Sequence, residues 1–150
     1  MATNDTELLR VAIELAAAAG REGELPYASL LVGPDGEILA RDHNTMLSTG
    51  DITGHPELKL ARWAALTFTP EECRGITMYT SCQPCSMCSP VIARAQLGRV
   101  VFALSADQLH DLQPADLPRP DGAEVRYVGP SEFDAAAAPI RAYHGNLDKH

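Results

Sequence analysis

The sequence HPE at residues 55–57 and the sequence PCSMC at residues 84–88 decide which fold and chemistry we expect from this chain. Cys85 and Cys88 are three residues apart, so their sulfur atoms would share one face of a helix that begins at the preceding proline. A helix N-terminus also stabilises thiolates. His55 precedes another predicted helix and adds an imidazole nitrogen. Two thiolates and an imidazole are ligand types that suit Zn²⁺.

Three protein ligands indicate a catalytic zinc site rather than a structural one. A structural site is closed by four protein ligands, whereas three ligands leave the fourth tetrahedral position to water. Glu57 stands two residues after His55 and brings a carboxylate beside the metal without being an obvious ligand. Such a carboxylate can take a proton from activated water and return it to a leaving amine. The pattern therefore predicts hydrolytic deamination.

The chain length and the hydrophobic periodicity predict one α/β domain. The sequence has 150 residues, of which 45% are hydrophobic. Apolar residues recur at helical spacing from 8 to 19, and a turn sequence at 33–36 predicts a β-hairpin. Residues 43–54 are polar and aperiodic, which predicts a loop. Two successive strand-helix-strand units then follow through residue 104, and this order predicts parallel strand pairing.

The last third of the chain has weaker patterns. The pattern of residues 124–128 predicts a short strand. A final helix is predicted beyond residue 131, and Pro139 should kink it or restart it. We treat residues 1–150 as a single domain with a core at about 5–130 and a C-terminal helix or lid at about 131–150.

Charge and hydropathy exclude several classes of partner. Twelve Lys and Arg against twenty Asp and Glu give a formal charge of −8, which is the wrong sign for neutralising phosphates. A small ligand is therefore favoured over nucleic acid. The sequence contains no apolar stretch of about 18 residues and no basic N-terminal signal, which predicts no membrane partner and a cytoplasmic location.

The cysteine spacing leaves one alternative open. Cys82, Cys85 and Cys88 are too close together in sequence for a useful disulfide framework, so they indicate metal or redox chemistry. Cys82 and Cys85 also form a C-x-x-C pair, which could be a redox dithiol or could supply Cys82 as a ligand. The redox interpretation leaves Cys88 and the upstream HPE sequence without a role.

The two motifs resemble the signature of the zinc-dependent cytidine deaminase-like superfamily, His-x-Glu followed by Pro-Cys-x-x-Cys. Residues 78–88, MYTSCQPCSMC, are similar to the branch that contains guanine deaminases, cytosine deaminases and tRNA adenosine deaminases. The resemblance covers roughly residues 5–130. It implies a three-layer α/β/α fold around a mixed five-stranded sheet, a Zn²⁺ cofactor and a homodimer.

The same resemblance implies three substrate-binding residues. Asn44 resembles the asparagine that precedes the zinc histidine and hydrogen-bonds the base or sugar, although it could instead only order its loop. Asp107 falls where guanine deaminase-like members place an acidic residue that contacts the base, and Tyr143 is placed like an aromatic residue that closes the pocket.

Three departures from the family pattern concern the substrate rather than the metal. Pro56 stands where Ala or Gly is usual and has no backbone N–H to donate to a substrate ring. The sequence YAS at residues 27–29 replaces the more usual Phe-Gly-Ala, which would reshape the pocket floor. Gln83 stands where Glu is common and removes a charge.

The leading hypothesis is deamination of a free nucleobase or a related amino-heterocycle, such as guanine, cytosine or a triazine. A tRNA adenosine deaminase is the alternative, but it should have a basic C-terminal helix, and the only lysine or arginine residues in 131–150 are Arg141 and Lys149. A nucleoside deaminase and a non-catalytic zinc domain are further alternatives. Glu57 argues against the non-catalytic domain because a structural site needs no proton shuttle.

Overall fold

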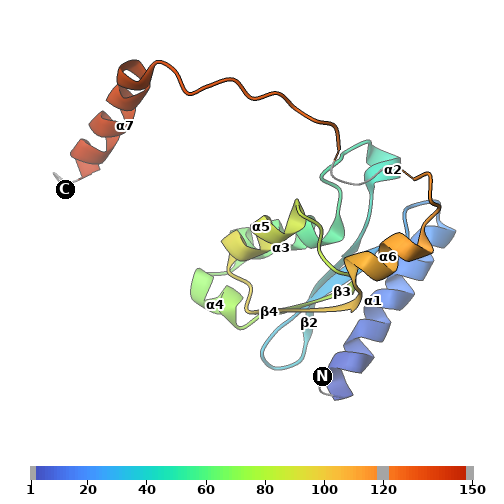
Figure 1. Ribbon diagram of the computed structural model, residues 1–150. Coiled ribbons are helices and arrows are strands. Elements are labelled where there is room, and N and C mark those ends of the chain that lie inside the picture. Colours follow the sequence, from blue (N-terminus) through green and yellow to red (C-terminus); the bar gives the residue numbers. More distant parts are fainter. Residues whose placement is uncertain (1–2, 118–121, 148–150) are drawn as a thin grey trace. The chain divides into compact units, whose positions relative to one another are not determined.

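The computed structural model describes residues 3–117 and 122–147 and divides the chain into two compact units, Met1–Leu117 and Pro118–His150 (Figure 1). Within the residues described, every strand and both hydrophobic clusters belong to the first unit. The first unit therefore positions the predicted site.

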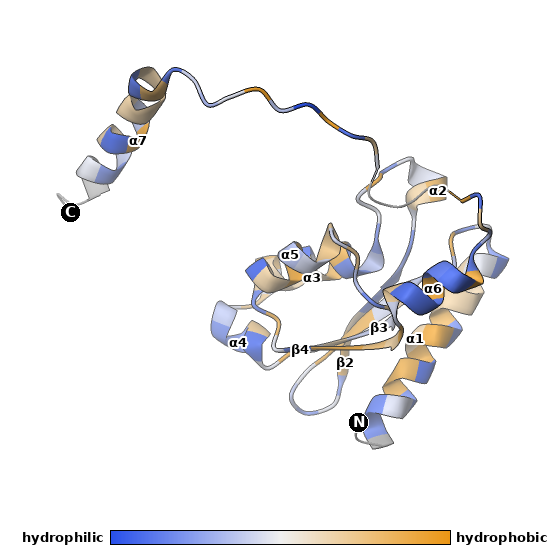
Figure 2. Cartoon of the chain, in the orientation of Figure 1, coloured by the Kyte–Doolittle hydropathy of each residue, from blue (hydrophilic) through white to orange (hydrophobic). Residues whose placement is uncertain are grey.

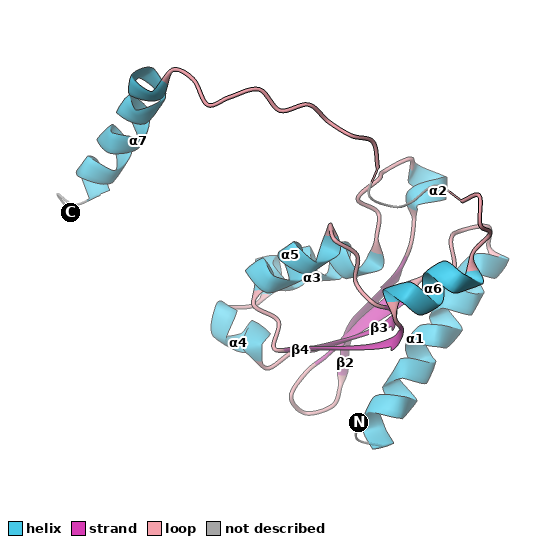
Figure 3. Ribbon diagram, in the orientation of Figure 1, coloured by secondary structure: helices cyan, strands magenta, loops and turns pink. Residues whose placement is uncertain are grey.

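The first unit is built on a mixed four-stranded sheet with the order β2-β1-β3-β4 (Figure 3). The strands are β1 (Ala28–Val32), β2 (Ile38–His43), β3 (Thr77–Cys82) and β4 (Arg99–Leu104). β1 and β2 form the predicted hairpin, whose turn contains Gly36 at φ 88°, a conformation that favours glycine. The α/β class and the mixed sheet are confirmed.

Parallel pairing was predicted for both strand-helix-strand units and is found in only one. β3 and β4 are parallel, but β1 lies between β2 and β3 and is antiparallel to both. All five residues of β1 are buried, whereas the residues of β2 are either partly buried or exposed. The central position goes to β1 because this strand has apolar or small residues on both faces.

The predicted fifth strand at residues 124–128 is absent from the part of the chain that the structure describes. This segment has no regular structure, and Tyr127 and Val128 are 90% and 85% exposed. A short strand is stable only when it pairs with a sheet and buries one face, and alternation in the sequence supplies neither. The prediction of five strands was wrong because the sheet has four.

Helices cover both faces of the sheet and complete the three layers. One face contacts α1 (Thr3–Arg21), and the other contacts α3 (Pro56–Thr67) and α5 (Cys88–Ala95). Figure 2 shows the concentration of hydrophobic residues in α1 and the mainly hydrophilic residues of α6 (Ala106–Leu112). The cluster under α1 is formed by Leu8, Leu9, Ala12, Leu30, Val32, Tyr79 and Val101. The cluster under α3 and α5 includes Leu31, Leu60, Ala61, Ala64, Ile76, Met78 and Ile92.

Two short helices lie in segments that were not predicted to be helical. α2 (Met46–Thr49) interrupts the predicted loop at 43–54, and α4 (Pro70–Arg74) follows α3. α4 begins with a capping box in which the Thr69 hydroxyl accepts from the Glu72 N–H and the Glu72 carboxylate accepts from the Thr69 N–H. Local capping bonds of this kind stabilise a single helical turn that has no long apolar period.

The second unit contains α7 (Phe133–Leu147). Pro139 lies inside this helix, so the helix continues past the residue that was predicted to kink it or restart it. The Arg141 guanidinium lies 5.7 Å from the centre of the Phe133 ring, and the Tyr143 and His144 rings meet edge to face. Among the described helices of both units, none is long and apolar enough to span a membrane.

Candidate zinc centre

The start of α3 and the turn before α5 supply the three candidate metal ligands. His55 is the N-cap residue of α3, with an extended backbone at φ −85° and ψ 135°. Cys88 is the first residue of α5, whereas Cys85 lies in the preceding turn, where its carbonyl accepts from the N–H groups of Cys88 and Ser89. The helix predicted to begin at Pro84 therefore begins four residues later, because a turn through Cys85 to Cys88 precedes its first regular hydrogen bonds.

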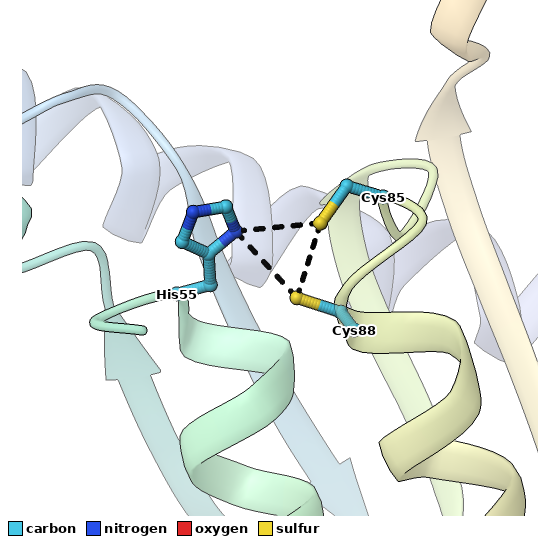
Figure 4. A group of neighbouring side chains, drawn as sticks. All are labelled: His55, Cys85 and Cys88. Atoms are coloured by element: carbon cyan, nitrogen blue, oxygen red, sulfur yellow. Dashed lines mark hydrogen bonds between the residues drawn. The ribbon is translucent and has the colours of Figure 1, made fainter. Parts of the chain in front are cut away.

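The three side chains converge as the sequence predicted (Figure 4). His55 Nδ1 lies 3.6 Å from Cys85 Sγ and 3.5 Å from Cys88 Sγ, and the two sulfur atoms are 3.4 Å apart. Tetrahedral coordination with ordinary zinc bond lengths separates nitrogen from sulfur by about 3.6 Å and sulfur from sulfur by about 3.8 Å. The donor atoms are therefore spaced to share one Zn²⁺ ion.

The charges of the two thiols also favour a cation. The Cys88 thiol donates to Cys85 and thereby lowers the pKa of Cys85, while the same pairing and burial raise the pKa of Cys88. Two thiolates at this separation repel each other unless a positive charge lies between them. A soft divalent cation lets both sulfurs ionise, so the chemistry of the donor set fits zinc.

Cys82 lies apart from this group. It is 7% exposed at the end of β3, and burial raises the pKa of its thiol. The cluster that the structure assembles from the described His, Cys, Asp and Glu residues consists of His55, Cys85 and Cys88. This geometry favours the ligand set with Cys88 over the C-x-x-C dithiol with Cys82.

Glu57 lies beside the three donors and is not one of them. Its side chain belongs to the first turn of α3 and is buried, with 6% of the residue exposed. One carboxylate oxygen, Oε1, accepts a 2.9 Å hydrogen bond from the Thr80 hydroxyl, and the other, Oε2, lies 3.9 Å from Cys88 Sγ. Burial raises the pKa of this carboxyl.

Asn44 is buried at the end of β2 and orders the chain that leads to α2. Its Oδ1 atom accepts from the Met46 N–H at 2.9 Å, and its own N–H donates to the Tyr27 carbonyl. No residue that the structure describes hydrogen-bonds to its Nδ2 group. The side chain therefore orders its loop and still has a free donor.

Asp107 and Tyr143 were predicted to contact the substrate, and they belong to different units of the chain. Asp107 is exposed in the first turn of α6, directly after β4. Tyr143 is 63% exposed in α7, where its ring meets His144, and it belongs to the separate second unit. Their roles stay predictions from the family resemblance.

Lys59 is a supporting residue that the sequence patterns did not reveal. Its Nζ donates to Asp42 Oδ1, to the His43 carbonyl and to Thr45 Oγ1, at 2.9 to 3.0 Å. These three bonds fix the backbone on both sides of Asn44. A lysine on a helix usually indicates a solvated face, so only the fold could reveal this role.

Two of the departures have structural consequences. Pro56 is buried as the first residue of α3, a position where a missing N–H costs no hydrogen bond. The Gln83 side chain accepts from the Ala106 N–H, and its backbone N–H donates to the Leu104 carbonyl. Gln83 therefore ties the segment before Cys85 to the start of α6.

Residues 2–104 match the cytidine and deoxycytidylate deaminase zinc-binding region. The chain belongs to this family. The match contains both motifs, and the zinc-binding region agrees with the cofactor predicted from the donor set.

Known proteins similar to this chain include several deaminases. A tRNA-specific adenosine deaminase of Agrobacterium fabrum is 31% identical over 97 residues, which cover 65% of this chain and 63% of that protein. A probable cytosine deaminase of Schizosaccharomyces pombe is 30% identical over 109 residues, which cover 73% of this chain and 65% of that protein. The chain thus spans a little under two thirds of the length of each of these two relatives.

A solved structure of guanine deaminase from Bacillus subtilis has a TM-score of 0.71, covers 97% of this chain, and is itself covered over 95% of its length. Its sequence is 22% identical to this chain. A structure from a study of tRNA:A34 deaminases has a TM-score of 0.58 at 29% identity and covers 67% of this chain and 76% of that one. These likenesses confirm the cytidine deaminase-like fold.

Proposed function

We propose that this chain is a zinc-dependent enzyme that hydrolytically deaminates a free nucleobase or related amino-heterocycle and releases ammonia. The observation that carries the proposal is the buried Glu57 carboxylate, whose Oε2 faces the group formed by His55, Cys85 and Cys88. A purely structural zinc site needs no carboxylate at this place. Family membership and deaminases among the relatives support the same activity.

The geometry gives each residue of the centre a separate role. His55, Cys85 and Cys88 would hold zinc, which when bound would supply an activated water molecule near neutral pH. Glu57 would take one proton of this water and deliver it to the ring nitrogen, and would then take the second proton from the hydroxyl on the attacked carbon and deliver it to the departing amine. The carbon exchanges its amino group for oxygen, and the products are the oxo-heterocycle and ammonia.

The substrate class is proposed from charge and from the available donors. The chain has a formal charge of −8, which opposes binding to a phosphate backbone. Asn44 Nδ2 has no hydrogen-bond partner among the residues that the structure describes and can contact a ring nitrogen or carbonyl. Pro56 cannot donate from its backbone, so pyrimidine recognition through that position is excluded. Guanine, cytosine and amino-triazines are the bases to test first.

A tRNA adenosine deaminase is the second candidate. The similarity to tRNA-specific adenosine deaminases, at 31% identity for the Agrobacterium fabrum protein, favours it. The acidic charge opposes it, because a tRNA enzyme must compensate the phosphates of an anticodon loop.

Ammonia release from the purified zinc-loaded protein tests the two candidates. The panel contains guanine, cytosine, an amino-triazine, cytidine and adenosine, with inosine formation in tRNA measured beside it. We expect turnover of at least one free base, and its loss after zinc is removed with a chelator. Preference for tRNA, with binding that weakens steeply as salt rises, would instead support the second candidate.

A homodimer is part of the same proposal, since it rests on the family resemblance. Light scattering coupled to size-exclusion chromatography should give twice the mass of the 16.1 kDa chain. A monomer that retains full turnover would contradict this part of the proposal without affecting the zinc chemistry.

A further inference from the structure

A line of buried hydroxyl groups runs from the middle of the sheet to Glu57. Ser29 Oγ donates to Thr80 Oγ1 at 2.7 Å, and Thr80 Oγ1 donates to Glu57 Oε1 at 2.9 Å. Ser29 and Thr80 both have 0% exposure. The line thus joins the sheet to the carboxylate without contact with solvent.

The pairing of β1 and β3 places these hydroxyls together. Ser29 and Thr80 are direct partners in the antiparallel register. Leu31 and Met78, which lie two residues further along the same strands, pack in the cluster under α3 and α5. Side chains two residues apart share a face of a strand, so Ser29 and Thr80 belong to the face that α3 covers.

The number of hydroxyl protons determines which group donates and which accepts along this line. Thr80 has one hydroxyl proton, and its second contact, with the Ala28 carbonyl, is long at 3.5 Å. When Ser29 donates to Thr80, the Thr80 proton is directed to Glu57, and each bond strengthens the next. Oε1 is then occupied as an acceptor, and Oε2 remains on the side of Cys88.

We propose that Ser29 and Thr80 are positioning residues that hold Oε1 of Glu57 against the sheet and thereby keep Oε2 as the oxygen that carries the proton. This inference rests on the proposed role of Glu57. The hydrogen bonds described for the two hydroxyls lead to each other, to the Ala28 carbonyl and to Glu57, and none leads to His55, Cys85 or Cys88. Two hydroxyls buried in an apolar layer also carry a desolvation cost, which their bonds to each other and to Glu57 offset.

Replacing Thr80 tests the step next to Glu57. Thr80→Val keeps the shape of the side chain and removes the hydroxyl, whereas Thr80→Ser keeps the hydroxyl and removes a methyl group. We expect Thr80→Val to lower kcat about 10- to 100-fold with KM within about threefold, because the lost interaction orients a proton carrier. Thr80→Ser should recover kcat to within about fivefold of the wild type.

Replacing Ser29 tests whether the line acts as a unit. Ser29→Ala should lower kcat less than Thr80→Val does, because Thr80 can still donate to Glu57 without support. The double variant Ser29→Ala/Thr80→Val should be no slower than Thr80→Val alone, since Ser29 acts through Thr80. Losses that simply multiply would contradict the proposed line.

Readouts that need no substrate separate positioning from folding. Zinc content should stay near the wild-type value in all these variants, and Thr80→Val should melt at a lower temperature because the buried Ser29 hydroxyl loses its acceptor. A crystal structure of Thr80→Val should show the Glu57 carboxylate rotated from its wild-type position or in several conformers. A crystal structure of Thr80→Ser should show the carboxylate back in its wild-type position. An unchanged, single Glu57 conformer in Thr80→Val would overturn the inference even if no substrate were in hand. If Thr80→Val does not fold, an unchanged Glu57 conformer and unchanged kcat in Ser29→Ala would overturn it.

The variant Glu57→Gln separates the proposed role of Glu57 from the positioning role of Ser29 and Thr80. An active Glu57→Gln variant would remove the proposed function of Glu57. An inactive Glu57→Gln beside a Thr80→Val variant with wild-type kcat would leave that function intact and overturn only the positioning role.

Discussion

At the scale of single residues, the centre depends on side chains that are close in sequence and on one that is not. Cys85 and Cys88 come from one turn, while His55 arrives from another helix and completes a triangle with sides of 3.4 to 3.6 Å. Such a set binds metal only when the first unit is folded. Metal binding is therefore coupled to the stability of the fold.

Cys85→Ala should lose zinc, while Cys82→Ala, its matched control, should retain about one zinc per chain. The reason is that Cys85 Sγ belongs to the donor triangle and the buried Cys82 thiol does not. Metal analysis of both purified variants measures this, and melting temperature should fall further in Cys85→Ala. Full zinc occupancy in Cys85→Ala together with loss in Cys82→Ala would assign the ligands to the other pair.

Asn44→Asp should raise KM about 10-fold or more, and it should also lower the melting temperature because it places a carboxylate in a buried position. The aspartate keeps the acceptor that binds the Met46 N–H and replaces the free Nδ2 donor with an acceptor. Steady-state kinetics on the best free base and a thermal melt check the two parts. An unchanged KM would reduce Asn44 to a residue that only orders its loop.

At the scale of elements, local patterns in the sequence predicted helices and the hairpin better than they predicted pairing. The period of α1 and the turn at residues 33–36 depend on neighbouring residues, and both predictions hold. The order of the strands depends on which strand can be buried on both faces. β1 can be buried in this way, and it lies between β2 and β3. Residues 124–128 alternate like a strand but have no partner in the described sheet, which no local pattern could indicate.

The turn between α5 and β4 makes a specific prediction about Gly98. A Cβ atom at this position would overlap the Arg74 carbonyl oxygen, so the backbone of one segment would have to move. Gly98→Ala should destabilise the first unit by about 2 kcal/mol or more, as overpacking against backbone does. Urea unfolding measures this, with Gly145→Ala in α7 as a control, since a Cβ there meets no atom within 4 Å. Equal stability of Gly98→Ala and wild type would show that the contact is easily relieved.

At the scale of the whole molecule, the site and the hydrophobic clusters belong to the first unit. The family match ends at residue 104, and the described cluster residues lie between Leu8 and Val101. The sequence motifs predicted the metal group and Glu57 because their spacing is local to two helix starts. Ser29, Thr80 and Lys59 act through contacts across strands and loops, so only the fold could assign them.

Removing residues 140–150 should leave zinc content and the melting temperature of the first unit close to those of the full chain. Among the residues that the structure describes, neither hydrophobic cluster contains a member of the deleted segment. Turnover of the shortened protein then tests the predicted lid, for which kcat must fall or KM must rise sharply. Normal turnover would remove Tyr143 from the proposed site.

The most direct test of the central claim is ammonia release by Glu57→Gln compared with the wild type, on the free base that the wild type turns over best. Glutamine keeps the volume and a hydrogen-bonding oxygen but cannot carry the proton. We expect one zinc per chain, an unchanged melting temperature and a loss of kcat of about 10⁴-fold or more, at or above the upper range for general acid–base catalysis. A loss below about tenfold, with zinc retained, would contradict the claim that Glu57 carries the proton in this reaction.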